Sequence, residues 1–300
     1  MKPGFLLTCF VVCQLVTCIC FVAWGEAEEG RLVKDQIGRS VPVPVQPKRV
    51  ISLIPSLTEI VFDLGRGDVL VGATQYAKEP PAAANLPRVG SYLHLDIERI
   101  VALKPDLCLG VRDGNPGHLI ERIEKMGIPV YAFDPQTISE IMESVRLLGD
   151  ILDARQRADE IVRAMKRKMA EVDQKVSRVN KKPGVFFQID AAPIVSAGSG
   201  TFIDRLINRA GGKNLAGGPV SYPRFSWEDI LAMQPEVVII ASMAGGYSEE
   251  QLKAAWRKWP QIPAVRQDRL YVVNADLFDR PVPRLVDGLV ELADILFPGP

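Results

Sequence analysis

The sequence predicts an α/β protein built from two Rossmann-like lobes that are bridged by a long helix. Strand-like and helix-like segments alternate through both halves of the chain, which is typical of parallel sheets with crossover helices. The phrase "IERIVALKPDLCLGV" at 97–111 returns as "WEDILAMQPEVVIIA" at 227–241. The intervening stretch 138–180 has no proline and one glycine. We therefore expect lobes over 28–137 and 181–300, with an interlobe helix over 138–180.

The first 27 residues differ from the rest of the chain. Lys2 precedes a long apolar run, and the small residues Gly25 and Ala27 follow it, as in a secretory signal peptide. This leader holds four of the five cysteines: Cys9, Cys13, Cys18 and Cys20. The run reaches about 20 residues, so a retained membrane anchor is an alternative. "LVTC" at 15–18 resembles a lipoprotein box, so lipidation is another. We expect a periplasmic protein cleaved near Ala27.

The first lobe opens with an expected hairpin at 31–45, where apolar and polar residues alternate around a turn and prolines mark an edge. The first core strand is "KRVISLIP" at 48–55. Ser56 and Glu59 then have the spacing of a capping box. That spacing predicts a helix over "LTEIVFDLG" that stops at Gly65.

The rest of this lobe keeps the alternation of strand and helix. Asp96 has the side chain and the position of a helix cap. The expected elements are a strand at 69–74, a helix at 95–105, a strand at 106–111, a helix at 118–127 and a strand at 128–134. Their order favours a parallel sheet.

The interlobe stretch carries apolar residues at helical spacing, namely Ile138, Ile141, Val145, Leu148, Ile161, Met165 and Met169. A continuous helix of ~43 residues would span about 65 Å, which exceeds one small lobe. The second lobe is then expected to hold strands at 184–190, 236–242 and 269–274 and helices at 201–212, 225–235, 248–259 and 283–297. Ser226 is the expected cap of the second of these helices.

Composition and motifs exclude several classes of function. The 36 basic and 36 acidic residues cancel without a basic stripe, so nucleic acid is not an expected partner. The sequence lacks the nucleophile-elbow, phosphate-loop, zinc-protease and paired-cysteine motifs, so we expect no enzyme. Cys108, in a strand pattern, is expected to be a buried inert thiol. His94 and His118 are too few for a His-rich metal cage, although His94 could still give one axial contact to a metal complex.

Aromatic residues in loops are the best candidates for a binding site. Tyr76, Tyr92 and Tyr222 fall in loops between strands and helices, and Phe278 follows the strand at 269–274. Ligands of open α/β sheets bind at the carboxyl ends of the strands, and rings there suit a flat, partly apolar ligand. Asp276 and Arg280 of the same loop could fix its polar groups. Ordinary surface packing is the alternative for each tyrosine.

Four stretches carry a resemblance to a known family: "PKRVISLIPSLTEIVFDLG", "LDIERIVALKPDLCLGVRDGN", "GPVSYPRFSWEDILAMQP" and "DLFDRPVPR". Over about 31–300 the chain resembles the helical-backbone solute-binding proteins of ABC importers for vitamin B12, siderophores and haem, and it is most similar to the vitamin B12 binders. The resemblance implies a monomer that carries a corrinoid between two lobes to a permease and its ATPase. It implies no cofactor other than this cargo. A ferric siderophore or haem as cargo, and a metal-dependent enzyme, are the alternatives.

The resemblance also implies roles for particular residues. The cargo residues would be Pro55, Tyr76, Tyr92, Tyr222, Asp276, Phe278 and Arg280. The chain departs from the vitamin B12 binders, which tend to have tryptophan in place of Tyr92 and Tyr222 and an aromatic residue in place of Val111. Glu98 and Glu228 match the glutamates that dock onto permease arginines. Both also fall in a first helical turn, where the helix dipole favours a carboxylate by about 0.3–1 kcal/mol, so a role in the helix start alone is the alternative.

Overall fold

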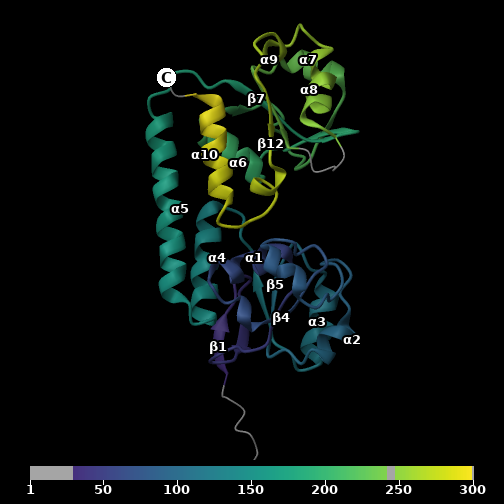
Figure 1. Ribbon diagram of the computed structural model, residues 1–300, viewed down its shortest axis with the longest axis vertical. Coiled ribbons are helices and arrows are strands. Elements are labelled where there is room, and N and C mark those ends of the chain that lie inside the picture. Colours follow the sequence, from purple (N-terminus) through teal and green to yellow (C-terminus); the bar gives the residue numbers. More distant parts are fainter. Residues whose placement is uncertain (1–29, 242–246, 299–300) are drawn as a thin grey trace, which may run out of the picture.

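The computed structural model describes residues 30–241 and 247–298, which form a two-stranded hairpin sheet and two larger β-sheets. Figure 1 shows one sheet in each of two lobes, with a long helix running along one side of both. The expected α/β class with two lobes is therefore confirmed. The predicted signal peptide at 1–27 lies outside the described residues. Within the described ranges, no helix is both long enough and apolar enough to cross a bilayer.

The N-terminal lobe contains a parallel sheet with the strand order β4-β3-β5-β6. Its strands are β3 (Val50–Ser52), β4 (Leu70–Ala73), β5 (Leu107–Val111) and β6 (Val130–Phe133), and its helices are α1 (Pro55–Asp63), α2 (Ile97–Ala102), α3 (Gly117–Lys125) and the 3-10 turns Gly67–Val69 and Pro81–Asn85. The expected hairpin is present as β1 (Arg31–Lys34) and β2 (Ser40–Val43), paired antiparallel. It is fastened to the edge strand β6 by a hydrogen bond from the Tyr131 hydroxyl to the Lys34 carbonyl, 3.0 Å long.

Helix α1 begins earlier than the sequence predicts, and the expected capping box is wrong. Pro55 is the first helical residue and follows the extended Ile54. Proline suits this position because its φ is already helical and its missing N–H would have no partner there. Ser56 is thus already inside the helix, where its buried hydroxyl has no hydrogen-bond partner within the described chain. The Glu59 side chain points away from the helix start, towards the other lobe.

The C-terminal lobe has a mixed sheet with the order β10-β8-β7-β11-β12, and β9 pairs with β7. Its strands are β7 (Gly184–Ala191), β8 (Ile194–Ser196), β9 (Lys213–Asn214), β10 (Arg224–Phe225), β11 (Val237–Ala241) and β12 (Leu270–Val273). Its helices are α6 (Phe202–Arg209), α7 (Trp227–Met233), α8 (Glu249–Arg257), α9 (Pro263–Arg266), α10 (Leu285–Leu296) and the 3-10 turn Ala275–Leu277. The parallel strands β7, β11 and β12 were expected. The short antiparallel strands β8 and β10 were not.

Both sheets are covered on both faces, as parallel sheets require. Successive residues of a strand point to opposite faces, so Ile51 and Cys108 face α2 and α3 while Val50 and Leu107 face the other way. The second set joins one large apolar cluster that runs past α4 and α5 into the C-terminal lobe. The outer face of the C-terminal sheet packs on its own cluster around Trp256.

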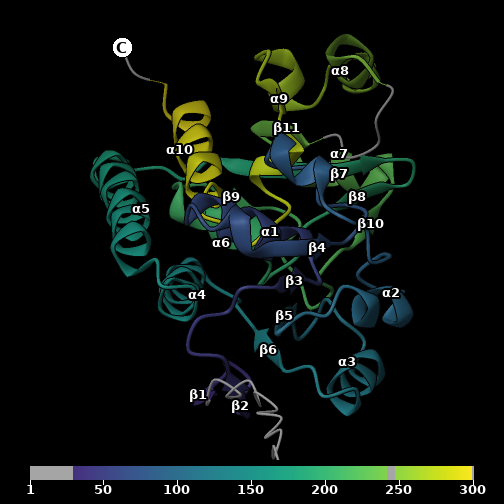
Figure 2. The ribbon, with the colours of Figure 1, turned by 60° about the horizontal axis from the view of Figure 1, so that its bottom comes forward.

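The single helix expected over 138–180 is wrong. The structure has α4 (Ile138–Ile151) and α5 (Arg155–Val176), which lie side by side in Figures 1 and 2. The chain reverses at Asp153, which has a left-handed φ of 54°. Close packing is possible there because a β-carbon on Gly149 would lie 2.5 Å from that of Ala158. Helix α5, about 33 Å long at ~1.5 Å per residue, packs on α4 and on α10 of the other lobe.

The repeated phrase builds the same turn in each lobe. Helices α2 and α7 end where Lys104 and Gln234 adopt left-handed φ angles of 46° and 50°. A proline follows each of them, and proline disfavours the α conformation in the residue before it. The left-handed residue therefore stops the helix and sends the chain into the next strand.

The acid after each proline then fastens the neighbouring strand. Asp106 Oδ2 accepts the backbone N–H of Arg49 at 3.0 Å, just before β3. Glu236 Oε2 accepts the backbone N–H of Gly184 at 2.8 Å, at the start of β7. The sequence repeat is thus a repeat of structure as well.

Candidate functional site

Two tyrosines stand together on the N-terminal lobe. Tyr76 follows β4, and Tyr92 lies in the loop before α2, so both come from the carboxyl-end side of the sheet. Their ring centroids are 5.8 Å apart with the planes tilted by 59°. Tyr76 is 48% exposed, so its ring is available to a ligand. Pro55, another predicted cargo residue, is buried at the start of α1.

Asn115 holds this part of the lobe together. Its buried side-chain amide donates to the carbonyls of Leu53 at 2.9 Å and Tyr92 at 3.1 Å, and its Oδ1 accepts from the N–H of Val111 at 2.9 Å. The ends of β3 and β5 are thereby joined to the tyrosine loop. Sequence reasoning missed this residue, because an asparagine before a proline indicates only a turn.

The C-terminal lobe offers a pocket of about 190 Å³ at the carboxyl ends of β7 and β11. It is lined by Phe187, Ile189, Phe202, Ile203, Tyr222, Ala241, Ala275, Phe278 and Asp279. Phe278 is 3% exposed and packs edge-on against Phe187, with ring centroids 5.3 Å apart, so it forms a wall of the pocket. Tyr222 is 60% exposed at the rim. Burial raises the pKa of Asp279, the one carboxyl group in this lining.

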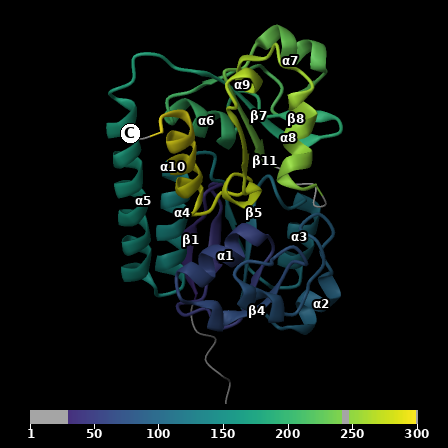
Figure 3. The same ribbon diagram turned by 45° about the horizontal axis from the view of Figure 1, so that its top comes forward.

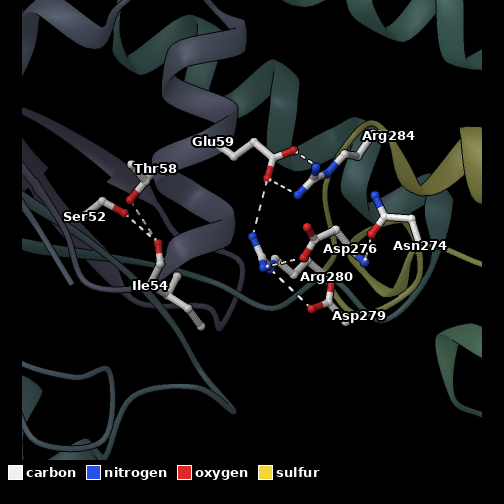
Figure 4. A network of polar contacts seen from close by, with 9 residues as sticks. All are labelled: Ser52, Ile54, Thr58, Glu59, Asn274, Asp276, Asp279, Arg280 and Arg284. Carbon is white, nitrogen blue, oxygen red and sulfur yellow. Dashed lines mark hydrogen bonds and ion pairs between the residues drawn. The ribbon is translucent and has the colours of Figure 1, made fainter. Parts of the chain in front are cut away.

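Asp276 and Arg280 are occupied by each other. Arg280 Nη2 lies 3.0 Å from Asp276 Oδ1, and Arg280 Nε lies 3.5 Å from Asp279 Oδ2. A third carboxylate oxygen, Glu59 Oε2, lies 3.9 Å from Arg280 Nη1. The positive charge of Arg280 is therefore largely neutralised within the protein (Figure 4).

Glu59 connects the two lobes. It belongs to α1, which lies on the side of the N-terminal lobe that faces the C-terminal lobe (Figure 3). Arg284, which precedes α10, approaches it with Nε at 2.8 Å from Oε1 and Nη2 at 3.0 Å from Oε2. Burial raises the pKa of the Glu59 carboxyl to about 7, although the charge of Arg284 acts to lower it. This contact could not be predicted from the sequence, because Glu59 and Arg284 are 225 positions apart.

Glu98 and Glu228 occupy equivalent positions. Each is the second residue of its helix, α2 or α7, and each is exposed. The expected caps are confirmed, because the side chains of Asp96 and Ser226 accept N–H groups of the first turns. In Figure 3, α2 and α7 lie far apart on the side of the molecule away from α5. Among the described residues, neither glutamate forms an ion pair.

The described residues contain no group of three His, Cys, Asp or Glu side chains that could hold a metal ion. Cys108 is buried, and burial raises the pKa of its thiol. His94 is exposed in the Tyr92 loop, with Nδ1 at 3.5 Å from the Ser91 hydroxyl. The candidate site is therefore a set of aromatic surfaces with few free charges, divided between two lobes.

The chain is similar to known binding proteins in both sequence and structure. A sequence profile described as "Periplasmic binding protein" matches residues 50–277. The vitamin B12-binding protein of Photorhabdus laumondii is 32% identical over 252 residues, which is 83% of this chain and 88% of that protein. The structure of the periplasmic vitamin B12-binding protein BtuF of Vibrio cholerae superposes with a TM-score of 0.74 at 28% identity, covering 84% of this chain and 98% of that one. A periplasmic heme-binding protein from Pseudomonas aeruginosa gives 0.72 at 30% identity, covering 84% and 94%.

Proposed function

The chain belongs to the periplasmic binding protein family, and from that premise we propose that it is the extracytoplasmic substrate-binding protein of an ABC importer whose cargo is a corrinoid. The likeness to vitamin B12-binding proteins supports this cargo. In this role the protein binds the corrinoid without changing it, and the importer's permease and ATPase perform the transport. Extracytoplasmic placement agrees with the predicted signal peptide, and a lipid anchor would leave the function unchanged.

One observation carries the proposal. Aromatic side chains gather on each lobe, as the Tyr76–Tyr92 pair and as the pocket below Tyr222. The ion pair between Glu59 and Arg284 shows that the adjoining faces of the lobes meet. A broad, partly apolar macrocycle between the lobes would contact both aromatic sets, and aromatic contacts contribute about 0.5–1.5 kcal/mol beyond buried area.

Haem is the second candidate, and the Tyr92 loop favours it. Tyr92 and His94 offer a phenol and an imidazole from one loop, and both groups are known ligands of haem iron. The heme-binding structural relative supports the same alternative. A ferric siderophore fits the site less well, because siderophore sites often use several arginines and the two candidate arginines here are paired with carboxylates. Arg112 Nη1 is 3.3 Å from Asp134 Oδ2, and Arg280 faces three carboxylates.

Delivery requires recognition by the permease. We assign this role to Glu98 and Glu228, because an exposed carboxylate on each lobe can pair with an arginine on each half of a two-fold permease. Arginine–carboxylate pairs are directional and often bidentate, so two of them would fix the orientation of docking.

Calorimetric titration with cyanocobalamin, cobinamide, haemin and a ferric siderophore tests the cargo. We expect heat with the corrinoids, and Tyr92→Ala or Tyr222→Ala should weaken binding by about 0.5–1.5 kcal/mol each. Tyr271→Ala is the matched control, because Tyr271 lies in β12 beside α5 and α10 and away from the candidate site. Binding of haemin but of neither corrinoid would establish the second candidate and reject the first.

A further inference from the structure

We propose that Glu59 and Arg284 form an interlobe clasp that fixes the relative position of the two lobes and positions Arg280 beside the cargo. Glu59 would thus be a positioning residue that does not itself contact the cargo. The part of this inference that concerns the cargo rests on the proposed function. The part that concerns the two lobes does not.

The geometry of the pair is specific. Two nitrogens of one guanidinium face the two oxygens of one carboxylate, at 2.8 and 3.0 Å. Only Nη2 donates a hydrogen bond, to Oε2, whereas the Nε–Oε1 contact is a close contact of opposite charges without hydrogen-bond geometry. A charge-assisted hydrogen bond together with a second charge contact restrains orientation as well as distance. The Glu59 side chain is 8% exposed and that of Arg284 is 23% exposed, so solvent screens the contact little. The contact joins α1 of one lobe to the start of α10 in the other, at the face between them (Figure 4).

Stability is a poor explanation for this arrangement. Desolvation of a buried carboxylate costs free energy that the ion pair offsets only in part, and buried ion pairs are often no better for stability than apolar side chains. The raised pKa of Glu59 expresses the same imbalance. The charged groups facing its carboxyl are Arg284 and Arg280 from the C-terminal lobe and Asp63 and Glu79 from its own lobe. A contact that joins two lobes but adds little to the free energy of unfolding is better explained by a role in positioning the lobes.

Arg280 is the link from the clasp to the candidate site. It lies between Glu59 on one side and Asp276 and Asp279 on the other. Asp279 also lines the aromatic pocket, so the guanidinium is held at the edge of that pocket. Loss of the Glu59 charge would leave Arg284 without its carboxylate and would let both arginines compete for Asp276 and Asp279. The pocket edge would then lose its fixed arrangement.

The experiment compares Glu59→Gln with Asp35→Asn in the full chain. Asp35 is a matched control, because it is also a buried carboxylate paired with an arginine, Arg39, at 2.8 Å, but within one lobe. Hydrogen–deuterium exchange without cargo should show several-fold faster exchange at 55–63 and 274–284 in Glu59→Gln only. Arg284→Lys keeps the charge but loses the two-nitrogen contact of the guanidinium, so it should give an intermediate effect. It also covers the case in which Glu59→Gln fails to fold.

Cargo binding is measured separately with cyanocobalamin and with haemin. Affinity for whichever probe binds should fall about tenfold in Glu59→Gln and remain unchanged in Asp35→Asn. If the wild-type protein binds neither probe, the proposed cargo is wrong. The hydrogen–deuterium exchange result then decides by itself whether Glu59 and Arg284 hold the lobes together. Unchanged exchange at both segments, or a uniform increase over the whole chain like that expected for a general loss of stability, would overturn the clasp.

Discussion

Replacing Glu59 by glutamine should change how the stability of the protein depends on pH. The folded-state pKa of this carboxyl is about 7, against an ordinary value of 4.5, because burial disfavours its charged form. Between these two values the folded protein therefore binds more protons than the unfolded chain does. The stability that this difference contributes is fully present below pH 4.5 and is lost as the pH rises through 7.

The magnitude follows from the size of the shift. A rise of about 2.5 pH units corresponds to roughly 3 kcal/mol at ~1.36 kcal/mol per unit, which is an upper figure because water can reach the site during fluctuations. The glutamine variant keeps the shape of the side chain but cannot ionise. The quantity to follow is the difference in free energy of unfolding between the wild type and Glu59→Gln. This difference should fall by up to roughly 3 kcal/mol between pH 4.5 and 7 and stay level above pH 7.

Urea denaturation at half-unit steps from pH 4.5 to 8.5, on both proteins, measures this difference directly. Other buried carboxyls, such as Asp63 and Asp279, titrate in both proteins and cancel in the subtraction. A difference that stays constant, or that grows with rising pH, would refute the reasoning. A constant difference would mean that the attraction of Arg284 balances the cost of desolvation, and a growing difference would mean that the attraction outweighs it.

Three further predictions concern other parts of the molecule. Glu98→Ala combined with Glu228→Ala should leave cargo affinity unchanged but weaken binding to the permease by roughly 2–5 kcal/mol per buried contact, and uptake into vesicles should fall. Lost cargo binding, or normal uptake, would contradict docking. Asn115→Ala should cost about 1–3 kcal/mol in urea denaturation and weaken cargo binding through the Tyr92 loop, and unchanged stability would show that its hydrogen bonds are replaceable. Gly149→Ala should cost about 1–3 kcal/mol by pressing against Ala158, whereas a stabilised variant, as helix propensity alone predicts, would show that α4 and α5 can separate freely.

The sequence was sufficient where structure depends on neighbours in the chain. The repeated phrase predicted a helix, a helix stop and a buried strand in each half of the chain. This unit is present in both halves because the left-handed residue and the proline after it act locally. The caps Asp96 and Ser226 were predictable for the same reason, since each accepts an N–H three residues ahead. The positions of the candidate aromatics at strand ends also follow from local pattern.

The errors lie where distant residues decide. The turn residues Leu152, Asp153 and Ala154 include no proline or glycine, so local pattern did not indicate that the long helix folds back. The tight packing of α4 on α5 supports this turn, and it involves residues on both helices.

Glu59 shows the same limit at the candidate site. Its spacing from Ser56 suggested a helix cap, whereas its actual partner, Arg284, comes from the other lobe. The local pattern determined most of the helices and strands, but it could not determine which side chains meet between the lobes. A side chain's partner depends on the packing of whole elements, and the energy of a buried charge depends on everything that packing brings close to it.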